Sequence, residues 1–196
     1  MFYDDFDKND AFETIVAIEK NGKYYTTMGL DELAEQFSGM VKKKFNAYHE
    51  FAGKPLEEVI DNSLLQKSKK YEVHELQSGF LRNDKGKFTF VPFSNALQVS
   101  PIRCMVKNKF SSTNKEAVFA AGNYFGVSPY HSRFDGFSGA LIQSDKSILL
   151  GHQIGINLAQ KAITELEVIT IKNKLYLIVA INNKKAEVYE ISNANK

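Results

Sequence analysis

Residues 5–19 read DFDKNDAFETIVAIE, an acidic stretch that runs directly into a β-branched segment. Side chains with oxygen donors recur at Asp5, Asp7, Asn9 and Glu13, which are positions 1, 3, 5 and 9 of a loop. This alternation lets a short loop wrap a hard cation, as the first half of an EF-hand loop does. The twelfth position lacks the EF-hand glutamate and the following residues favour a strand, so the stretch predicts a short calcium loop before a strand.

The predicted calcium ligands are the side chains of Asp5, Asp7, Asn9 and Glu13 and the backbone carbonyl of Ala11. Asp10 stands where an EF-hand has glycine, and aspartate tolerates the left-handed backbone better than most residues. Magnesium fits this ligand set less well, because it demands stricter geometry and keeps more of its water. The alternative interpretation is a solvated acidic turn that binds no ion.

Tight turns and short alternating runs predict an antiparallel, mainly β architecture. Asn21-Gly22 is a strong type I′ signal between strands near 14–19 and 23–26. Further strands are predicted near 76–83, 86–91, 101–107, 116–121, 138–144, 147–150, 164–171, 174–181 and 185–191. No strand–helix–strand alternation appears, so a parallel sheet is not expected.

One segment departs from the strand period. Between about 30 and 70 apolar residues recur at steps of three and four, which is typical of amphipathic helices. The apolar positions are Leu30, Leu33, Ala34, Phe37, Val41, Phe45 and Tyr48, and then Leu56, Val59, Ile60 and Leu64. Pro55 suits the first position of the second helix. The pattern predicts a helical hairpin inserted into the β structure.

Composition excludes several function classes. The net charge is +2, from 25 basic and 23 acidic residues that are mixed along the chain, so nucleic-acid binding is not predicted. The single cysteine, Cys104, rules out an internal disulfide and is predicted to be a buried structural thiol. No apolar run is long enough for membrane insertion, and the N-terminus lacks the pattern of an export signal.

Several motifs occur in an order that resembles FG-GAP/VCBS repeat proteins. The first is the loop and strand from Asp5 to Ile18. The others are Tyr24–Thr27, Asp31–Leu33, Lys42–Phe45, Tyr48–Ala52, Phe80–Phe88, Leu97–Ile102, Ala121–Gly126 and Arg133–Asp135. The resemblance covers nearly the whole chain and extends to Bacteroidetes-type surface proteins with an ASPIC-like C-terminal region. A second loop of this kind, Lys109–Ala117, has lost its carboxylates and is predicted not to bind calcium.

The resemblance implies a partial β-propeller of antiparallel four-stranded blades. About eleven strands supply two to three blades, whereas closed propellers have about four to eight. Residues 1–196 are therefore predicted to form a single partial propeller domain with the helical insertion at about 30–70. Missing N-terminal blades or a homo-oligomer are expected to complete it.

The function that the resemblance implies is non-catalytic: a calcium-stabilised scaffold for protein or polysaccharide binding, outside the cell or at its surface. The candidate ligand-binding residues are Tyr124, Phe125, Tyr130, His131, Arg133 and Asp135. Two alternatives remain at this point. The chain is a structural piece that completes a larger propeller or oligomer, or it is a hydrolase that uses His131, Arg133 and Asp135.

Overall fold

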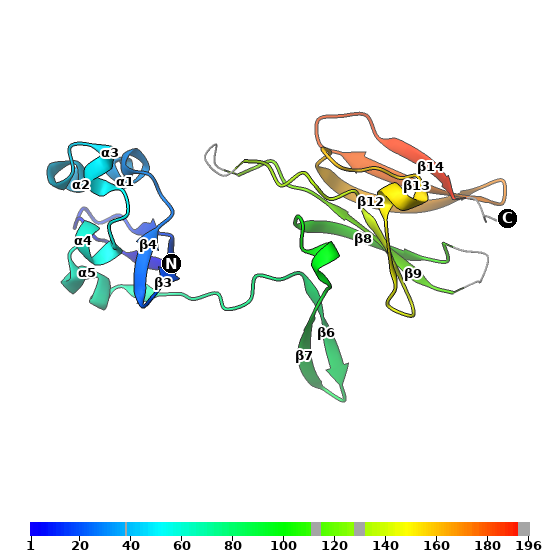
Figure 1. The fold of residues 1–196 in the computed structure, drawn as a ribbon, viewed down its shortest axis with the longest axis horizontal. Helices are drawn as coiled ribbons and strands as arrows, with labels where there is room; N and C mark the ends of the chain where they lie inside the picture. Colours follow the sequence, from blue (N-terminus) through cyan, green and yellow to red (C-terminus); the bar gives the residue numbers. More distant parts are fainter. Residues whose placement is uncertain (38, 111–114, 128–131, 192–196) are drawn as a thin grey trace. The chain divides into compact units, whose positions relative to one another are not determined.

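The computed structural model describes residues 1–37, 39–110, 115–127 and 132–191. They divide into two compact units, Met1–Glu75 and Leu76–Lys196, where the sequence predicts one domain with an insertion. The structure is mainly β with several small antiparallel sheets, which confirms the predicted class (Figure 1). The described residues form no closed ring of blades, so the arrangement in propeller blades stays a prediction.

The first unit contains two small sheets. The three-stranded sheet has the order β2-β1-β5, and a separate hairpin pairs β3 with β4. Their bounds are Phe2–Asp4 (β1), Glu13–Ile15 (β2), Ala17–Lys20 (β3), Lys23–Thr26 (β4) and Lys69–Lys70 (β5). Asn21 and Gly22 have φ angles of 56° and 76°, as a type I′ turn requires. The strand predicted near 14–19 is broken at Val16, because its two halves pair in different sheets.

The helical segment is present but is not a two-helix hairpin. It forms five short helices, Leu30–Gln36 (α1), Met40–Lys44 (α2), Tyr48–Phe51 (α3), Leu56–Val59 (α4) and Asn62–Lys67 (α5). Gly39 interrupts the first stripe with a left-handed φ of 82°. Pro55 lies just before α4 instead of at its first helical position. Asp61 separates the last two helices and accepts a hydrogen bond from the Ser63 N–H.

The predicted apolar stripes nevertheless form the core of the first unit. Leu33, Phe37, Val41, Leu56 and Ile60 are almost fully buried. Phe6 and Ile15 join them from the strand segments, and the Phe6 ring packs edge-on against Phe37 with the centroids 5.8 Å apart. Tyr48 is the exception, since half of it is exposed. The periodicity therefore identifies the buried face correctly although the helix boundaries are wrong.

The second unit contains the remaining predicted strands. Their bounds are Gly79–Asp84 (β6), Lys87–Pro92 (β7), Ile102–Asn108 (β8), Ala117–Gly122 (β9), Ala140–Gln143 (β10), Ile148–Leu150 (β11), Ile163–Ile171 (β12), Lys174–Ile181 (β13) and Glu187–Ile191 (β14). Strands β8 to β11 form a four-stranded meander, and β12 to β14 form a three-stranded one. The hairpin β6–β7 stands as a two-stranded sheet of its own.

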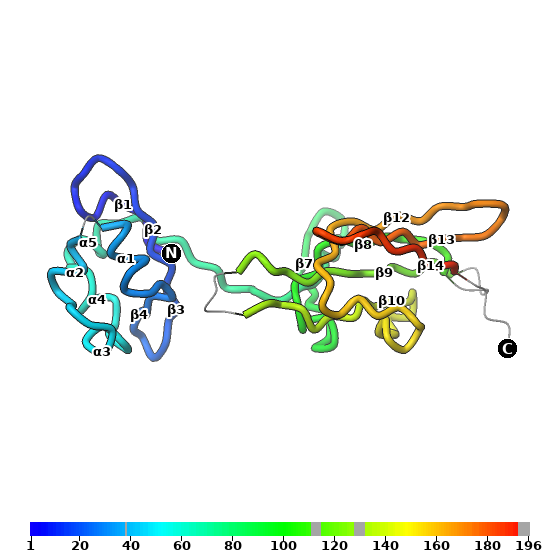
Figure 2. The backbone as a smooth tube through the Cα atoms, turned by 90° about the horizontal axis from the view of Figure 1, so that it is seen from above, coloured from blue at the N-terminus to red at the C-terminus, as the bar shows by residue number. Residues whose placement is uncertain are grey.

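Both faces of the four-stranded sheet are covered. On one face Phe119 and Ala121 pack against Leu166, Leu177 and Val179 of the β12–β14 sheet. Figure 2 shows this sheet lying alongside β8 and β9. On the other face a smaller cluster forms around Leu97, Phe137 and Ala140. Short 3-10 turns at Asn95–Leu97 (η1) and Gly151–Ile154 (η3) flank this cluster.

Asn123 joins three segments at the end of β9. Its side-chain amide donates to the carbonyls of Phe137, Leu158 and Lys161 over 3.0 to 3.1 Å, and its oxygen accepts from the Phe137 N–H. Only 2% of Asn123 is exposed, and its φ of 73° is left-handed. These bonds fix the loop before β12.

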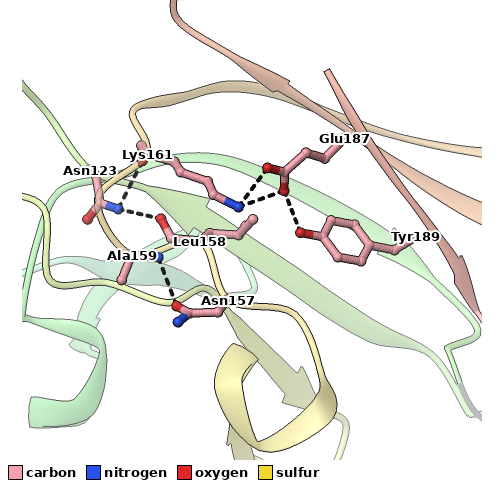
Figure 3. Close-up of polar contacts among 7 residues, drawn as sticks. All are labelled: Asn123, Asn157, Leu158, Ala159, Lys161, Glu187 and Tyr189. Carbon is pink, nitrogen blue, oxygen red and sulfur yellow. Dashed lines mark hydrogen bonds and ion pairs between the residues drawn. The ribbon is translucent and has the colours of Figure 1, made fainter. Parts of the chain in front are cut away.

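An ion pair anchors the same loop to the last strand. Lys161 Nζ lies 2.7 and 2.8 Å from the two carboxylate oxygens of Glu187, and the Tyr189 hydroxyl donates to that carboxylate (Figure 3). The hydrogen bond and the charge of Lys161 lower the pKa of Glu187. Burial and the neighbouring carboxylate raise the pKa of Tyr189 to about 12. This cluster connects residues before β12 with β14.

Each helix in the described part of the chain is too short or too polar to cross a bilayer.

Candidate metal centre and binding surface

The acidic loop connects β1 to β2. Asp4 and Glu13 are paired across the two strands, so residues 5–12 form a loop between two directly paired residues. Glu13 opens strand β2, which confirms that a strand follows the loop. Lys8 and Asp10 have φ angles of 60° and 68°, so Asp10 adopts the left-handed backbone expected of it.

Three of the predicted ligands converge. Asp5, Asp7 and Glu13 each place one carboxylate oxygen within 4.8 Å of the others, a spacing that one metal ion can bridge. Glu13 is only 6% exposed and its Oε2 accepts the Phe6 N–H at 2.9 Å. Asp7 Oδ1 is fully shielded from solvent and has no hydrogen-bond partner among the residues that the structure describes. A shielded carboxylate oxygen without a partner is costly, and a cation would satisfy it.

The electrostatics of the loop favour an added positive charge. Burial is the main reason that the pKa of Glu13 is raised above its ordinary value, and the nearby Asp7 and Asp5 carboxylates raise it further. The Phe6 N–H opposes this shift without cancelling it. Like charges that are held together in a partly dry site disfavour ionisation. A bound divalent cation would favour the ionised form of these carboxylates.

Asn9 lies beside the cluster, and its side chain is engaged within the loop. Its Nδ2 donates to Asp7 Oδ2 at 3.1 Å, and its Oδ1 accepts the Ala11 N–H at 2.8 Å. The predicted roles of Asn9 and of the Ala11 carbonyl as ligands stay predictions.

The sequence alone does not reveal how the loop holds Asp5. One carboxylate oxygen of Asp5 accepts the Asn9 N–H and the other accepts the Asp10 N–H, each over 3.0 Å. Asp4 caps the loop start by accepting the Asp5 N–H at 3.0 Å. These contacts within the loop bring the Asp5 carboxylate close to those of Asp7 and Glu13.

The predicted ligand-binding residues fall on a second surface. Tyr124 and Phe134 form an antiparallel bridge with backbone bonds of 2.8 and 3.0 Å, and both residues are more than one third exposed. The Arg133 guanidinium lies 5.0 Å from the Phe125 ring centroid, and that of Arg103 lies 5.5 Å from the Tyr124 ring. The sequence does not predict Arg103 as a neighbour of these aromatic side chains. Tyr130 and His131 lie outside the described residues.

The hydrolase alternative gains no support from the described members of its set. Arg133 stacks on Phe125, and the Asp135 backbone carbonyl accepts the Gln160 N–H at 2.7 Å. The third member, His131, lies outside the described residues. Part of the degenerate loop Lys109–Ala117, residues 111–114, also lies outside them.

A polar pair that the sequence did not predict lies in a pocket of the second unit. Ser138 Oγ and His152 Nδ1 are 3.1 Å apart. Val99, Gly136 and Asn157 also line the pocket. Ser138 is 8% exposed, which limits the access of a substrate to its hydroxyl. Among the described residues that line the pocket none is a carboxylate that could orient the imidazole, so these residues offer no third group of a catalytic triad.

Cys104 is half-buried on β8, with its thiol 3.7 Å from the Ala121 carbonyl. Burial raises the pKa of this thiol to about 11. A thiol of this kind is a weak nucleophile near neutral pH, because the thiolate is the reactive form. This environment agrees with a structural role.

Comparison with protein-family models gives no match for this sequence, and searches of the curated proteins and of the solved structures also give none.

Proposed function

We propose that this chain is a calcium-stabilised, non-catalytic binding module of the FG-GAP/VCBS type. The observation that carries the proposal is the convergence of Asp5, Asp7 and Glu13, together with the shielded and unpartnered Asp7 Oδ1. Hard carboxylate oxygens from one short loop suit calcium, which accepts six to eight oxygen ligands in flexible geometry. Asn9 and the Ala11 carbonyl complete the proposed ligand set.

The β8–β11 meander supports the propeller part of the proposal. Its strands are consecutive in the chain and antiparallel throughout, which is the topology of a four-stranded blade. The proposed setting is outside the cell or at its surface, where millimolar calcium can load a weak site. The exposed Tyr124, with Phe125 and Arg133, would then contact a protein or polysaccharide partner.

Calcium titration of the full chain tests the metal site. We expect calcium to raise the melting temperature, because a ligand that binds only the folded state stabilises it by about 2.7 kcal/mol at one hundred times its dissociation constant. Asp7→Asn should weaken calcium binding, measured by calorimetry, by at least about tenfold, since it removes a charged ligand.

Asp10→Asn is the matched control. Asp10 lies in the same loop, is exposed and has a left-handed φ that asparagine also tolerates. The Asp10→Asn variant should bind calcium nearly as well as the unmodified chain. Identical melting curves in calcium and in a chelator would contradict the proposal, as would equal loss of affinity in the Asp7 and Asp10 variants.

A further inference from the structure

The hairpin β6–β7 carries its charged side chains on one face only, together with Phe80 and Val91. Its register pairs Leu81 with Phe90, Arg82 with Thr89 and Asn83 with Phe88. Because successive strand residues point to opposite faces, Arg82, Asp84, Lys87 and Thr89 share one face. Leu81, Phe88 and Phe90 share the other face with the uncharged Asn83, and we call this the apolar face.

The apolar face is uncovered by the described residues. Leu81 is 63% exposed, Phe88 61% and Phe90 36%. On the opposite face Arg82 and Asp84 form an ion pair of 2.8 Å. Clustered exposed apolar side chains on a folded domain mark an interaction surface.

The hairpin is held firmly at its base. The Gln98 side chain bonds the N–H and the carbonyl of Ser78 over 2.8 and 2.9 Å, and the Phe80 ring packs on Phe93. Within the second unit the hairpin projects from the body of the sheets (Figure 1). Among the described residues no third strand pairs with either outer edge. A two-stranded ribbon of this kind is marginal in water and invites strand addition.

The sequence of β7 is self-complementary about its centre. In Lys87-Phe88-Thr89-Phe90-Val91, a phenylalanine lies on each side of Thr89. We propose that β7 pairs antiparallel with β7 of a second copy, about a two-fold axis at Thr89. In this register Phe88 faces Phe90 of the second copy, and Lys87 faces Val91 of the second copy.

Charge and side-chain direction select a second copy as the occupant. The register continues the apolar face across both hairpins, which gives one four-stranded sheet with paired aromatic side chains. No two like charges lie opposite each other, because the only charge on β7 is Lys87. A two-fold contact requires such a self-complementary patch. The inference does not depend on the calcium loop.

Charges introduced at the axis test the register. In Thr89→Lys two ammonium groups would face each other, and the dimer should weaken by at least about tenfold. Thr89→Asp should weaken it in the same way. An equal mixture of the two variants should recover a dimer, because each lysine then faces an aspartate. Light scattering after size exclusion reports the mass, and circular dichroism verifies that each variant is folded.

Thr170→Lys, at an exposed threonine of β12, is the control and should dimerise like the unmodified chain. A concentration-dependent dimer that behaves in this way supports the inference. The inference is overturned if the unmodified chain stays monomeric at every concentration. It is also overturned by a dimer that Thr89→Lys leaves intact, or by a mixture that recovers no dimer.

Discussion

The backbone N–H of Phe6 donates to the Glu13 carboxylate across 2.9 Å, so the start of the acidic loop is bonded to its end. The Phe6 ring is buried and packs against Phe37, while Glu13 is paired with Asp4 at the end of the β1–β2 pair. The carboxylate cluster is therefore attached to the core of the first unit. Its charge state should affect the stability of that unit.

Without calcium, Glu13 should destabilise the folded chain as pH rises. The folded pKa of Glu13 lies above its ordinary value of 4.5, so the unfolded chain releases this proton first. The contribution is fully favourable below about pH 4.5 and is lost as pH rises through the folded pKa. Urea unfolding in a chelator should therefore show Glu13→Gln to be more stable than the unmodified chain at neutral pH, and not at acid pH.

Calcium should reverse the order of these two proteins at neutral pH. Glutamine still accepts the Phe6 N–H but offers the ion no charge, so we expect calcium to bind Glu13→Gln at least about tenfold more weakly. Because the unmodified chain and Glu13→Gln differ only at residue 13, the difference between their stabilities excludes the effects of other carboxylates that titrate in this range. A Glu13→Gln chain that is less stable than the unmodified one in the chelator at neutral pH would refute this account.

Asn123 should be among the most sensitive positions of the second unit. Replacement by alanine removes four hydrogen bonds, among them those to the buried N–H and carbonyl of Phe137, which should cost at least about 3 kcal/mol of unfolding free energy. Asn123→Gly tolerates the left-handed backbone and should be less damaging by about 1 kcal/mol. Urea unfolding followed by circular dichroism measures both. A loss below about 1 kcal/mol in the alanine variant would argue against this role.

Cys104 should react slowly in the folded chain. Burial shifts the pKa of its thiol from 9.0 to about 11, so the thiolate fraction at pH 8 falls by about a hundredfold. Labelling by iodoacetamide should be slower by that factor or more than in the urea-unfolded chain. Equal rates in the two states would mean that the thiol is exposed.

Much of the β structure could be predicted because its signals are local. The predicted strands after residue 75 coincide with β6 to β14 within a few residues, since alternation and turn residues act over short distances. Asn21-Gly22 adopts the predicted turn for the same reason. The break at Val16 could not be predicted, because it depends on β2 pairing with β1 and β3 pairing with β4.

The sequence by itself determined the antiparallel strands, the buried stripe of the helical segment and the acidic loop that leads into a strand. Each depends on residue spacing within a few turns or one strand. Only the tertiary structure decided that the Phe6 ring of the acidic loop packs against Phe37, and that Asn123 binds segments up to 38 residues away. It also left the apolar face of β6–β7 uncovered. These features depend on packing between segments that are distant in sequence, which no local pattern encodes.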